Sequence, residues 1–130
     1  MRKQYHHRKV GDDTHLWDVH RLVRLARDIT PEMIPISDIT EVDENWWYQE
    51  PGAVPTPRSF AEHMILVRDT DLAHPIILCA EGRLMDGMHR VVKALARGDT
   101  HIAARRFAVT PPPDHINVTL ADLPYPDEDI

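Results

Sequence analysis

The sequence has a single cysteine, no long apolar run and fewer basic than acidic residues. The lone thiol, Cys79, excludes an internal disulfide and favours a reducing, cytoplasmic setting. No stretch approaches the roughly 20 consecutive apolar residues that cross a bilayer. The N-terminal residues MRKQYHHRKVGDD also lack the apolar core of a signal peptide. We therefore expect a cytoplasmic protein with no membrane partner.

The shortage of positive charge bears on the choice of partner. Fifteen Lys and Arg stand against 21 Asp and Glu, which gives a formal net charge of −6. Residues 1–10 contain four basic residues and no acid, whereas residues 28–50 contain seven acids and no Lys or Arg. Proteins that grip nucleic acid phosphates usually have the opposite balance. A basic arm can touch DNA, but the acidic body would repel it, so composition disfavours nucleic acid as the partner.

A length of 130 residues predicts one domain, residues 1–130, with a single core. Hydrophobic periodicity and end signals predict three helices, over residues 14–28, 56–71 and 86–97. The second helix begins with a capping hydroxyl and a first-turn proline, Thr56-Pro57. For the third, Asp86 can cap the start and Gly98 follows the end.

Strands are predicted over residues 33–39, 75–80, 83–85 and 100–109. The run 75–80 is apolar throughout and indicates a buried strand, and Glu81-Gly82 after it predicts a hairpin turn. Residues 1–13 are expected to be a mobile arm, and 40–57 a loop with one short helical turn. Residues 110–130 read as a proline-rich, acidic, extended tail with a short turn at 119–123. This order predicts a small α+β domain with a mixed sheet.

The rest of the chain is organised around the stretch DGMHR, residues 86–90. A glycine-bearing junction that opens a helix presents backbone N–H groups and the positive end of the helix dipole, which together favour an anion such as phosphate. The predicted phosphate-binding residues are Gly87, Met88, His89, Arg90 and Lys93. The competing interpretation is a plain hairpin-to-helix joint.

Strand, Glu-Gly turn, strand, DGMHR, helix, Gly and strand together resemble the ParB/sulfiredoxin-like superfamily over residues 33–107. The resemblance implies nucleotide phosphates at this turn, with ATP, ADP or CTP and Mg²⁺ as cofactors. Sulfiredoxin's catalytic cysteine is replaced by Met88, which disfavours sulfinic acid reduction. The arginine-rich turn and the helix-turn-helix domain of ParB are missing too. The free serine kinase branch stays open.

The resulting hypothesis is a nucleotide-binding phosphotransferase that acts on a small-molecule substrate. Its rivals are a non-catalytic nucleotide-sensing or protein-interaction module and a nucleic-acid-binding or nuclease domain. Oligomeric state is left open. The catalytic candidates are Glu41 and Glu44 as general base, together with His89. Each glutamate has a competing interpretation as part of a solvated acidic loop.

Asp86 is the predicted magnesium ligand. Trp46 and Trp47 are the predicted substrate-binding residues, which can stack a base, although core packing competes as an explanation. Nine histidines without an HxH, HExxH or Cys/His cluster predict no structural zinc site. His63 and His74 flank the second helix and can either approach the site or lie on the surface.

Overall fold

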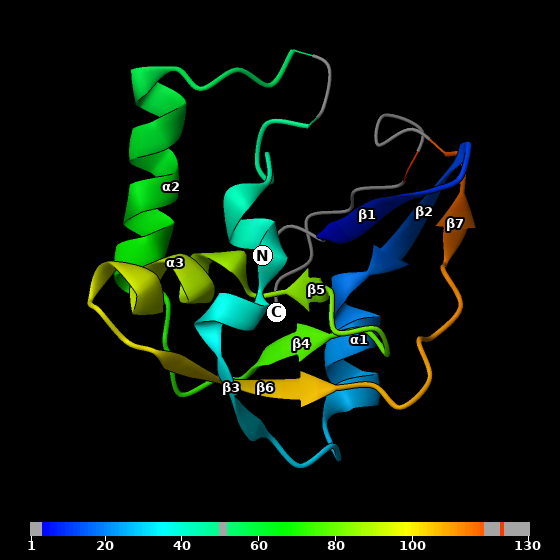
Figure 1. Ribbon diagram of the computed structural model, residues 1–130. Coiled ribbons are helices and arrows are strands. Elements are labelled where there is room, and N and C mark those ends of the chain that lie inside the picture. Colours follow the sequence, from blue (N-terminus) through cyan, green and yellow to red (C-terminus); the bar gives the residue numbers. More distant parts are fainter. Residues whose placement is uncertain (1–3, 50–51, 119–122, 124–130) are drawn as a thin grey trace.

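The computed structural model describes residues 4–49, 52–118 and 123, which form two sheets and three helices (Figure 1). Along the chain the elements are β1 (Tyr5–Val10), β2 (Asp13–Asp18), α1 (Val19–Ala26), β3 (Glu32–Pro35), the 3₁₀ turns η1 (Ile36–Asp38) and η2 (Thr40–Asp43), α2 (Pro57–Asp69), β4 (Ile76–Leu78), β5 (Leu84–Asp86), α3 (Met88–Ala96), β6 (His101–Arg106) and β7 (His115–Ile116). None of the helices in this described part of the chain has the length and apolar character of a membrane span.

The larger sheet has the strand order β3-β6-β4-β5. Strand β4 runs parallel to β6 and antiparallel to β5, and β3 runs antiparallel to β6. The predicted small α+β domain with a mixed sheet and three helices is therefore confirmed. The smaller sheet, β1-β2-β7, lies beside it and is antiparallel throughout (Figure 1).

Strand β4 is covered on both faces, as its continuous apolar run predicts. Ile76 and Leu78 pack in the cluster that contains α3, whereas Ile77 and Cys79, the residue that follows β4, pack in the cluster that contains α1. All four side chains are at most 4% exposed. Because successive strand residues point to opposite faces, this single strand joins the two halves of the core and fixes α1 and α3 on either side of the sheet.

The N-terminal prediction is wrong. Part of the expected mobile arm is strand β1, which pairs with β2 through a turn at Gly11, where φ is +62°. The helix expected from residue 14 begins at Val19, because residues 13–18 are β2 and the Asp18 carboxylate accepts from the backbone N–H of His20 at 3.0 Å. Part of the expected extended tail is a strand as well, β7, which pairs with β2. The turn expected at 119–123 lies almost wholly outside the described residues.

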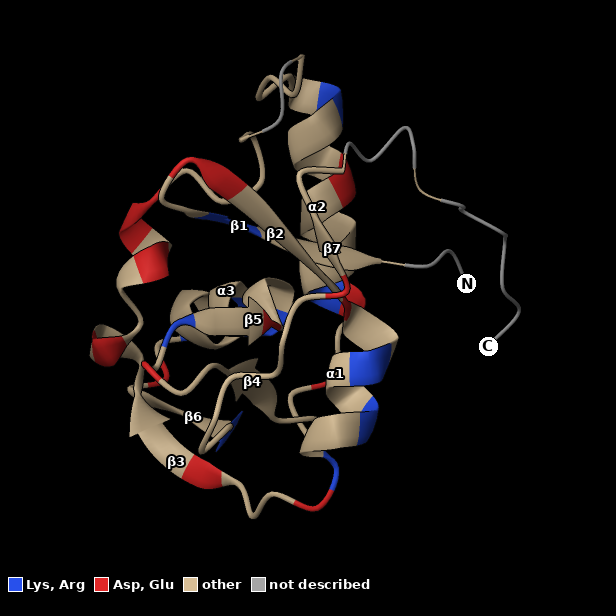
Figure 2. Cartoon of the chain, turned by 90° about the vertical axis from the view of Figure 1, so that its right-hand side faces the viewer, with Lys and Arg blue, Asp and Glu red and all other residues tan. Residues whose placement is uncertain are grey.

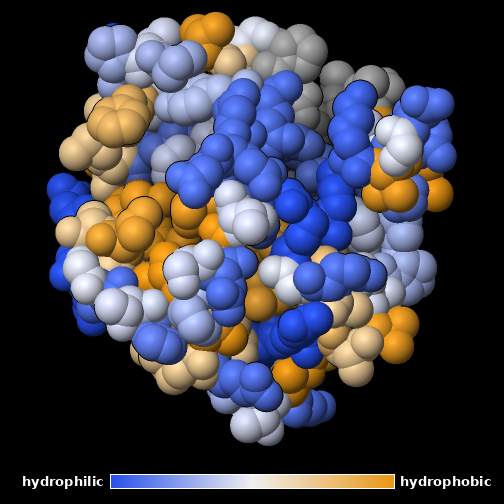
Figure 3. Space-filling view, viewed as in Figure 1, coloured by the Kyte–Doolittle hydropathy of each residue, from blue (hydrophilic) through white to orange (hydrophobic). Residues whose placement is uncertain are grey.

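The other segments follow the prediction more closely. The strand expected over residues 33–39 is β3 up to Pro35 and then turns into η1, and the expected short helical turn in the loop is η2. Helix α2 begins as expected, with Thr56 Oγ1 accepting from Ser59 N at 3.1 Å. No residue of α2 is buried, however, and Phe60 and Met64 are more than half exposed. Figure 3 shows apolar surface on the side of the molecule that carries α2 and α3.

The junction before α3 differs from the prediction in one respect. The N-cap is Gly87 in a left-handed conformation, with φ +113°, and no side chain caps the helix. The expected cap, Asp86, instead accepts a hydrogen bond from Arg90. A Cβ at Gly87 would lie 2.7 Å from Ile76 Cγ2, so this glycine is required by the close approach of the chain to β4 as well as by its backbone angle.

Substitution of Gly87 therefore tests the junction. Gly87→Ala forces an alanine into a left-handed backbone conformation and brings its Cβ into a clash with Ile76. We expect this change to lower the free energy of unfolding by about 2–4 kcal/mol. Gly98→Ala is the matched control, because its φ is +85° but no atom lies within 4 Å of the added carbon. We expect about 1–2 kcal/mol there. Urea unfolding measures both, and equal losses would contradict the packing role of Gly87.

Candidate functional site

The side chains of the DGMHR stretch have separate sets of partners. Arg90 donates to Asp86 Oδ2 at 2.8 Å and to the carbonyl oxygens of His74 and Pro75 at 3.1 and 3.2 Å. Lys93 Nζ donates to the carbonyl oxygens of Arg68 and Thr70 at the end of α2. Met88 is buried in the core. The predicted phosphate-binding side chains therefore do not converge on one point in front of the helix.

Arg90 lines a cavity of about 380 Å³ between α1, the sheet and the start of α3. Three further arginines line the same cavity: Arg24, Arg27 and Arg105. Basic residues follow one another along α1 in Figure 2. Asp86 is the one carboxylate among the described lining residues, and burial raises its pKa while Arg90 opposes that rise. Four apolar residues line the cavity as well: Val23, Ala26, Pro75 and Ile77. We call this feature the arginine cavity.

Two of the four guanidinium groups in the arginine cavity are held by backbone carbonyls. Arg105 Nη1 donates to the carbonyl oxygens of Arg27 and Ile29, just as Arg90 is held by those of His74 and Pro75. A guanidinium has five N–H donors, so both keep donors for a ligand. No described residue pairs with the side chains of Arg24 and Arg27. This grouping could not be predicted from the sequence, because its members come from three separate segments.

His89, in contrast, lies against α2 and the Trp46–Tyr48 segment. Its Nε2 is 2.9 Å from His63 Nδ1, and the indole of Trp47 lies nearly parallel to both imidazoles, with ring centroids 4.2 Å from His63 and 4.9 Å from His89. Burial, His63 and Arg90 lower the pKa of His89 to about 4. Burial also lowers the pKa of His63, against the opposing effect of Glu62. We call His63, His89 and Trp47 the histidine pair and its indole.

Of the two histidines expected near the second helix, His63 thus approaches a predicted site residue. His74 is exposed and lies 4.0 Å from Asp71, although it also borders the arginine cavity. Trp46 stacks on His6, which in turn lies against Trp17, with centroid separations of 5.7 Å in both cases. Trp46 and Trp47 therefore contact different histidines, and each tryptophan is partly buried against the core cluster of α3.

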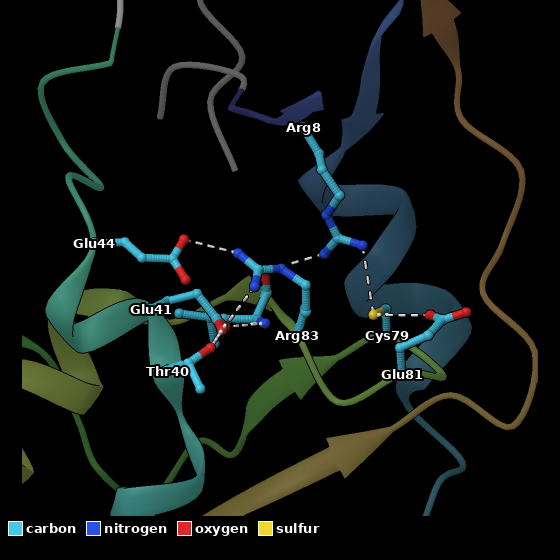
Figure 4. A network of polar contacts seen from close by, with 8 residues as sticks. Arg8, Thr40, Glu41, Glu44, Cys79, Glu81 and Arg83 are labelled. Carbon is cyan, nitrogen blue, oxygen red and sulfur yellow. Dashed lines mark hydrogen bonds and ion pairs between the residues drawn. The ribbon is translucent and has the colours of Figure 1, made fainter. Parts of the chain in front are cut away.

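Glu41 and Glu44 have different environments (Figure 4). Glu41 is only 2% exposed, and its carboxylate accepts from Leu84 N at 2.5 Å and from Thr40 Oγ1 at 2.9 Å. Arg83 lies between the two glutamates, 3.7 Å from Glu41 and 2.9 Å from Glu44, which raises the pKa of the Arg83 guanidinium. Neither glutamate borders the arginine cavity. Glu41 connects η2 to β5, and each of its two oxygens accepts a hydrogen bond from a protein donor.

Cys79 belongs to a neighbouring polar group. Its thiol donates to Glu81 Oε2 at 3.2 Å and lies 3.5 Å from Arg8 Nη1, while Arg8 also donates to the carbonyl oxygen of Leu84 at 3.4 Å (Figure 4). The Cys79 side chain is fully buried. These contacts fasten strand β1 to the turn between β4 and β5 and to the start of β5.

No group of three or more His, Cys, Asp and Glu side chains that could hold a metal occurs among the described residues. Asp86 therefore belongs to no group of three such side chains within that part of the chain. A cation at Asp86 would need oxygens from a ligand, which is the usual situation for Mg²⁺ with phosphates.

Removal of the Glu41 carboxylate tests its structural role. Glu41→Ala leaves a buried backbone N–H at Leu84 without an acceptor, and we expect a loss of about 2–4 kcal/mol in the free energy of unfolding. Glu44→Ala removes a half-exposed ion pair from the same arginine and should cost at most about 1 kcal/mol. Chemical denaturation of both variants checks the difference. A Glu41→Ala protein as stable as Glu44→Ala would leave Glu41 available as a catalytic base.

The buried imidazole of His6 predicts how the stability of the fold depends on pH. Burial, with Arg8 and His7, lowers the pKa of His6 to about 3, and its Nε2 has no hydrogen-bond partner among the residues that the structure describes. Since the unfolded chain takes up the proton near pH 6.5, stability is lost as pH falls from about 6.5 to about 3, with a slope of at most about 1.4 kcal/mol per pH unit. His6→Phe keeps the ring and should flatten this slope in thermal unfolding between pH 7 and 4. His74→Gln, at an exposed site, should leave it unchanged; an unaltered slope in His6→Phe would contradict the assignment.

Comparison of the chain with protein-family models, with curated proteins and with solved structures finds no match. The resemblance to the ParB/sulfiredoxin-like superfamily therefore gains no support from these comparisons, and it remains a prediction from the motif and its setting. What is established is a small α+β domain in which the motif residues divide between an arginine cavity and a stacked histidine pair.

Proposed function

We propose that the protein binds the phosphate groups of a nucleotide in the arginine cavity. One observation carries the proposal: four arginines line a single cavity in a chain whose formal net charge is −6. Guanidinium groups are the side chains best suited to phosphate oxygens, because they donate in a planar fork and stay charged. The volume of about 380 Å³ is within the range of small-molecule sites.

The lining suits a ligand with an anionic part and an apolar part. Arg90 and Arg105 are held in place by carbonyl oxygens, so they lose little freedom when a phosphate binds. The side chains of Val23, Ala26 and Ile77 offer apolar contact for a base or a sugar. Asp86 binds Arg90 through Oδ2, and we assign to its Oδ1 the single protein contact of a Mg²⁺ that is otherwise held by phosphate oxygens and water.

We propose further that the protein transfers a phosphoryl group from that nucleotide to a small molecule in the cytoplasm. The rival is a module that senses the nucleotide without turning it over. The rival draws support from the carboxylates, since Glu41 is enclosed by its own hydrogen bonds and neither Glu41 nor Glu44 borders the cavity. Nucleotide turnover that depends on an added metabolite would favour the enzyme, and binding without turnover would favour the sensor.

A simpler explanation competes with phosphate binding. Arg24 and Arg27 lie at the end of α1, where cations interact favourably with the helix dipole without any ligand. That explanation predicts a loss of stability when either residue is replaced, but no dependence of stability on nucleotide. The two explanations therefore predict different results when the stability of the protein is measured with and without a nucleotide.

The measurement is thermal unfolding with ATP, ADP or CTP, with and without Mg²⁺. A ligand at 100 times its dissociation constant should add about 2.7 kcal/mol of stability, a shift of several degrees for a chain of this size. Arg24→Ala and Arg27→Ala should each reduce that shift.

Arg58→Ala is the control, because Arg58 is an exposed arginine of α2 outside the cavity. Inorganic phosphate alone tests for the anion without the base. No shift with any nucleotide, or an equal loss of shift in Arg58→Ala, would contradict the proposed function.

A further inference from the structure

A second cavity, of about 300 Å³, is lined by strand β1, by the segment that follows η2 and by the start of β5. It shares no described lining residue with the arginine cavity. We call it the β1 cavity. Two features that the proposed function does not use border it: the basic run near the N-terminus of the sequence, and the buried imidazole of His6.

The imidazole of His6 is the most informative group in this lining. Only 8% of His6 is exposed, yet its Nε2 has no hydrogen-bond partner among the residues that the structure describes. Trp17 of β2 and Trp46 of the segment after η2 lie against the imidazole, each with a centroid separation of 5.7 Å. The two indoles hold the ring without bonding to its nitrogens. A buried polar atom without a partner destabilises the fold, and a bound group that pairs with Nε2 removes that cost.

Positive charge predominates around the β1 cavity, although the chain as a whole has a formal net charge of −6. Arg8, Lys9 and Arg83 border the cavity, and Glu44 is the one carboxylate among its described lining residues. Figure 4 shows Arg8 reaching from β1 toward Arg83, with Glu44 on the far side of Arg83. Three cations against one carboxylate leave an excess of two positive charges, which favours an anionic ligand.

The three cations differ in how far the protein already engages them. Arg83 is paired with Glu44 at 2.9 Å. Arg8 makes only long hydrogen bonds in the described part of the chain, at 3.4 Å to the carbonyl oxygen of Leu84 and 3.5 Å to Cys79 Sγ. Since a guanidinium has five N–H donors, most donors of Arg8 are left for a ligand. Lys9 is exposed and has no ion-pair partner among the described residues.

We propose that the β1 cavity binds a small organic molecule through an oxyanion, either a carboxylate or a phosphate monoester, which accepts hydrogen bonds from Arg8 and from His6 Nε2. A neutral imidazole carries its hydrogen on one of two nitrogens. No described residue bonds to either nitrogen of His6, so the protein does not fix the tautomer. An oxyanion at Nε2 selects the tautomer with the hydrogen on that atom.

The remaining lining limits the size and character of the ligand. A volume of about 300 Å³ is at the lower end of the range for small-molecule sites, which suits a molecule smaller than a nucleotide. The amides of Asn45 and Gln49 border the cavity too. Gln49 donates to the carbonyl oxygen of Trp46, and its own Oε1 has no partner among the described residues. It can therefore accept a hydrogen bond from a hydroxyl or amino group of the ligand.

The test is a titration of the unaltered full chain, with ¹⁵N-labelled imidazoles, against inorganic phosphate and, separately, against succinate. We expect a saturable change in the His6 resonances that ends with Nε2 in its N–H form and Nδ1 without a hydrogen. A histidine with a purely structural role would not respond to the anion. A response to phosphate alone assigns a phosphate monoester, a response to succinate alone assigns a carboxylate, and a response to both supports an oxyanion of either kind.

Variants locate the binding, with the indole N–H resonance of Trp46 as the signal because Trp46 borders the cavity. Lys9→Ala should weaken binding by about threefold, the effect of one exposed charge. His6→Phe should weaken it by about tenfold, the effect of one hydrogen bond to a charged group. Arg58→Ala is the matched control, because it removes one positive charge at an exposed residue of α2 outside the cavity and should bind as the unaltered protein does.

Three results would overturn the proposal. The first is no saturable change at His6 or Trp46 with either anion, and the second is equal affinity in Lys9→Ala and Arg58→Ala. The third is a response confined to His74, which borders the arginine cavity and would assign the anion to that cavity instead. None of these results depends on whether the arginine cavity takes a nucleotide, because the two cavities share no described lining residue.

Discussion

The burial of strand β4 on both faces is the constraint on which the rest of the structure depends. Ile76 and Leu78 anchor α3, and Ile77 and Cys79 anchor α1, so one short strand sets the position of both helices. The end of α1 and the start of α3 are thereby held on either side of the same sheet. The arginine cavity exists because two helices from distant parts of the chain are fixed to one strand.

The junction at Gly87 divides the motif between two environments. The left-handed glycine brings the chain against Ile76 and starts α3 without a side-chain cap. The next two polar side chains then serve different neighbours: His89 reaches α2 and the indole of Trp47, whereas Arg90 borders the cavity next to α1. A five-residue stretch thus contributes to two groups of side chains that differ in chemistry, one rich in guanidinium groups and the other built from neutral imidazoles.

Local signals predicted the parts of the fold that local physics decides. The buried strand, the Glu-Gly turn and the proline-started helix were correct, because turn residues, caps and apolar runs act within a few positions. The N-terminal hairpin was missed because Leu16, Val19 and Leu22 also fit a helical spacing, and the pairing of β1 with β2 overrode it. Neither candidate site was predictable in full, since each combines side chains from separate elements that only the tertiary structure brings together.

Helix α2 is attached in a way that has consequences for its dynamics. None of its residues is buried, and its described polar links to α3 are the Lys93 ammonium at its last carbonyls and the contact between His63 and His89. Few apolar contacts hold it, so detachment of this helix should require much less free energy than unfolding of the sheet. Its amide hydrogens should exchange with solvent well before those of α3, and proteases should cleave the chain first in this region.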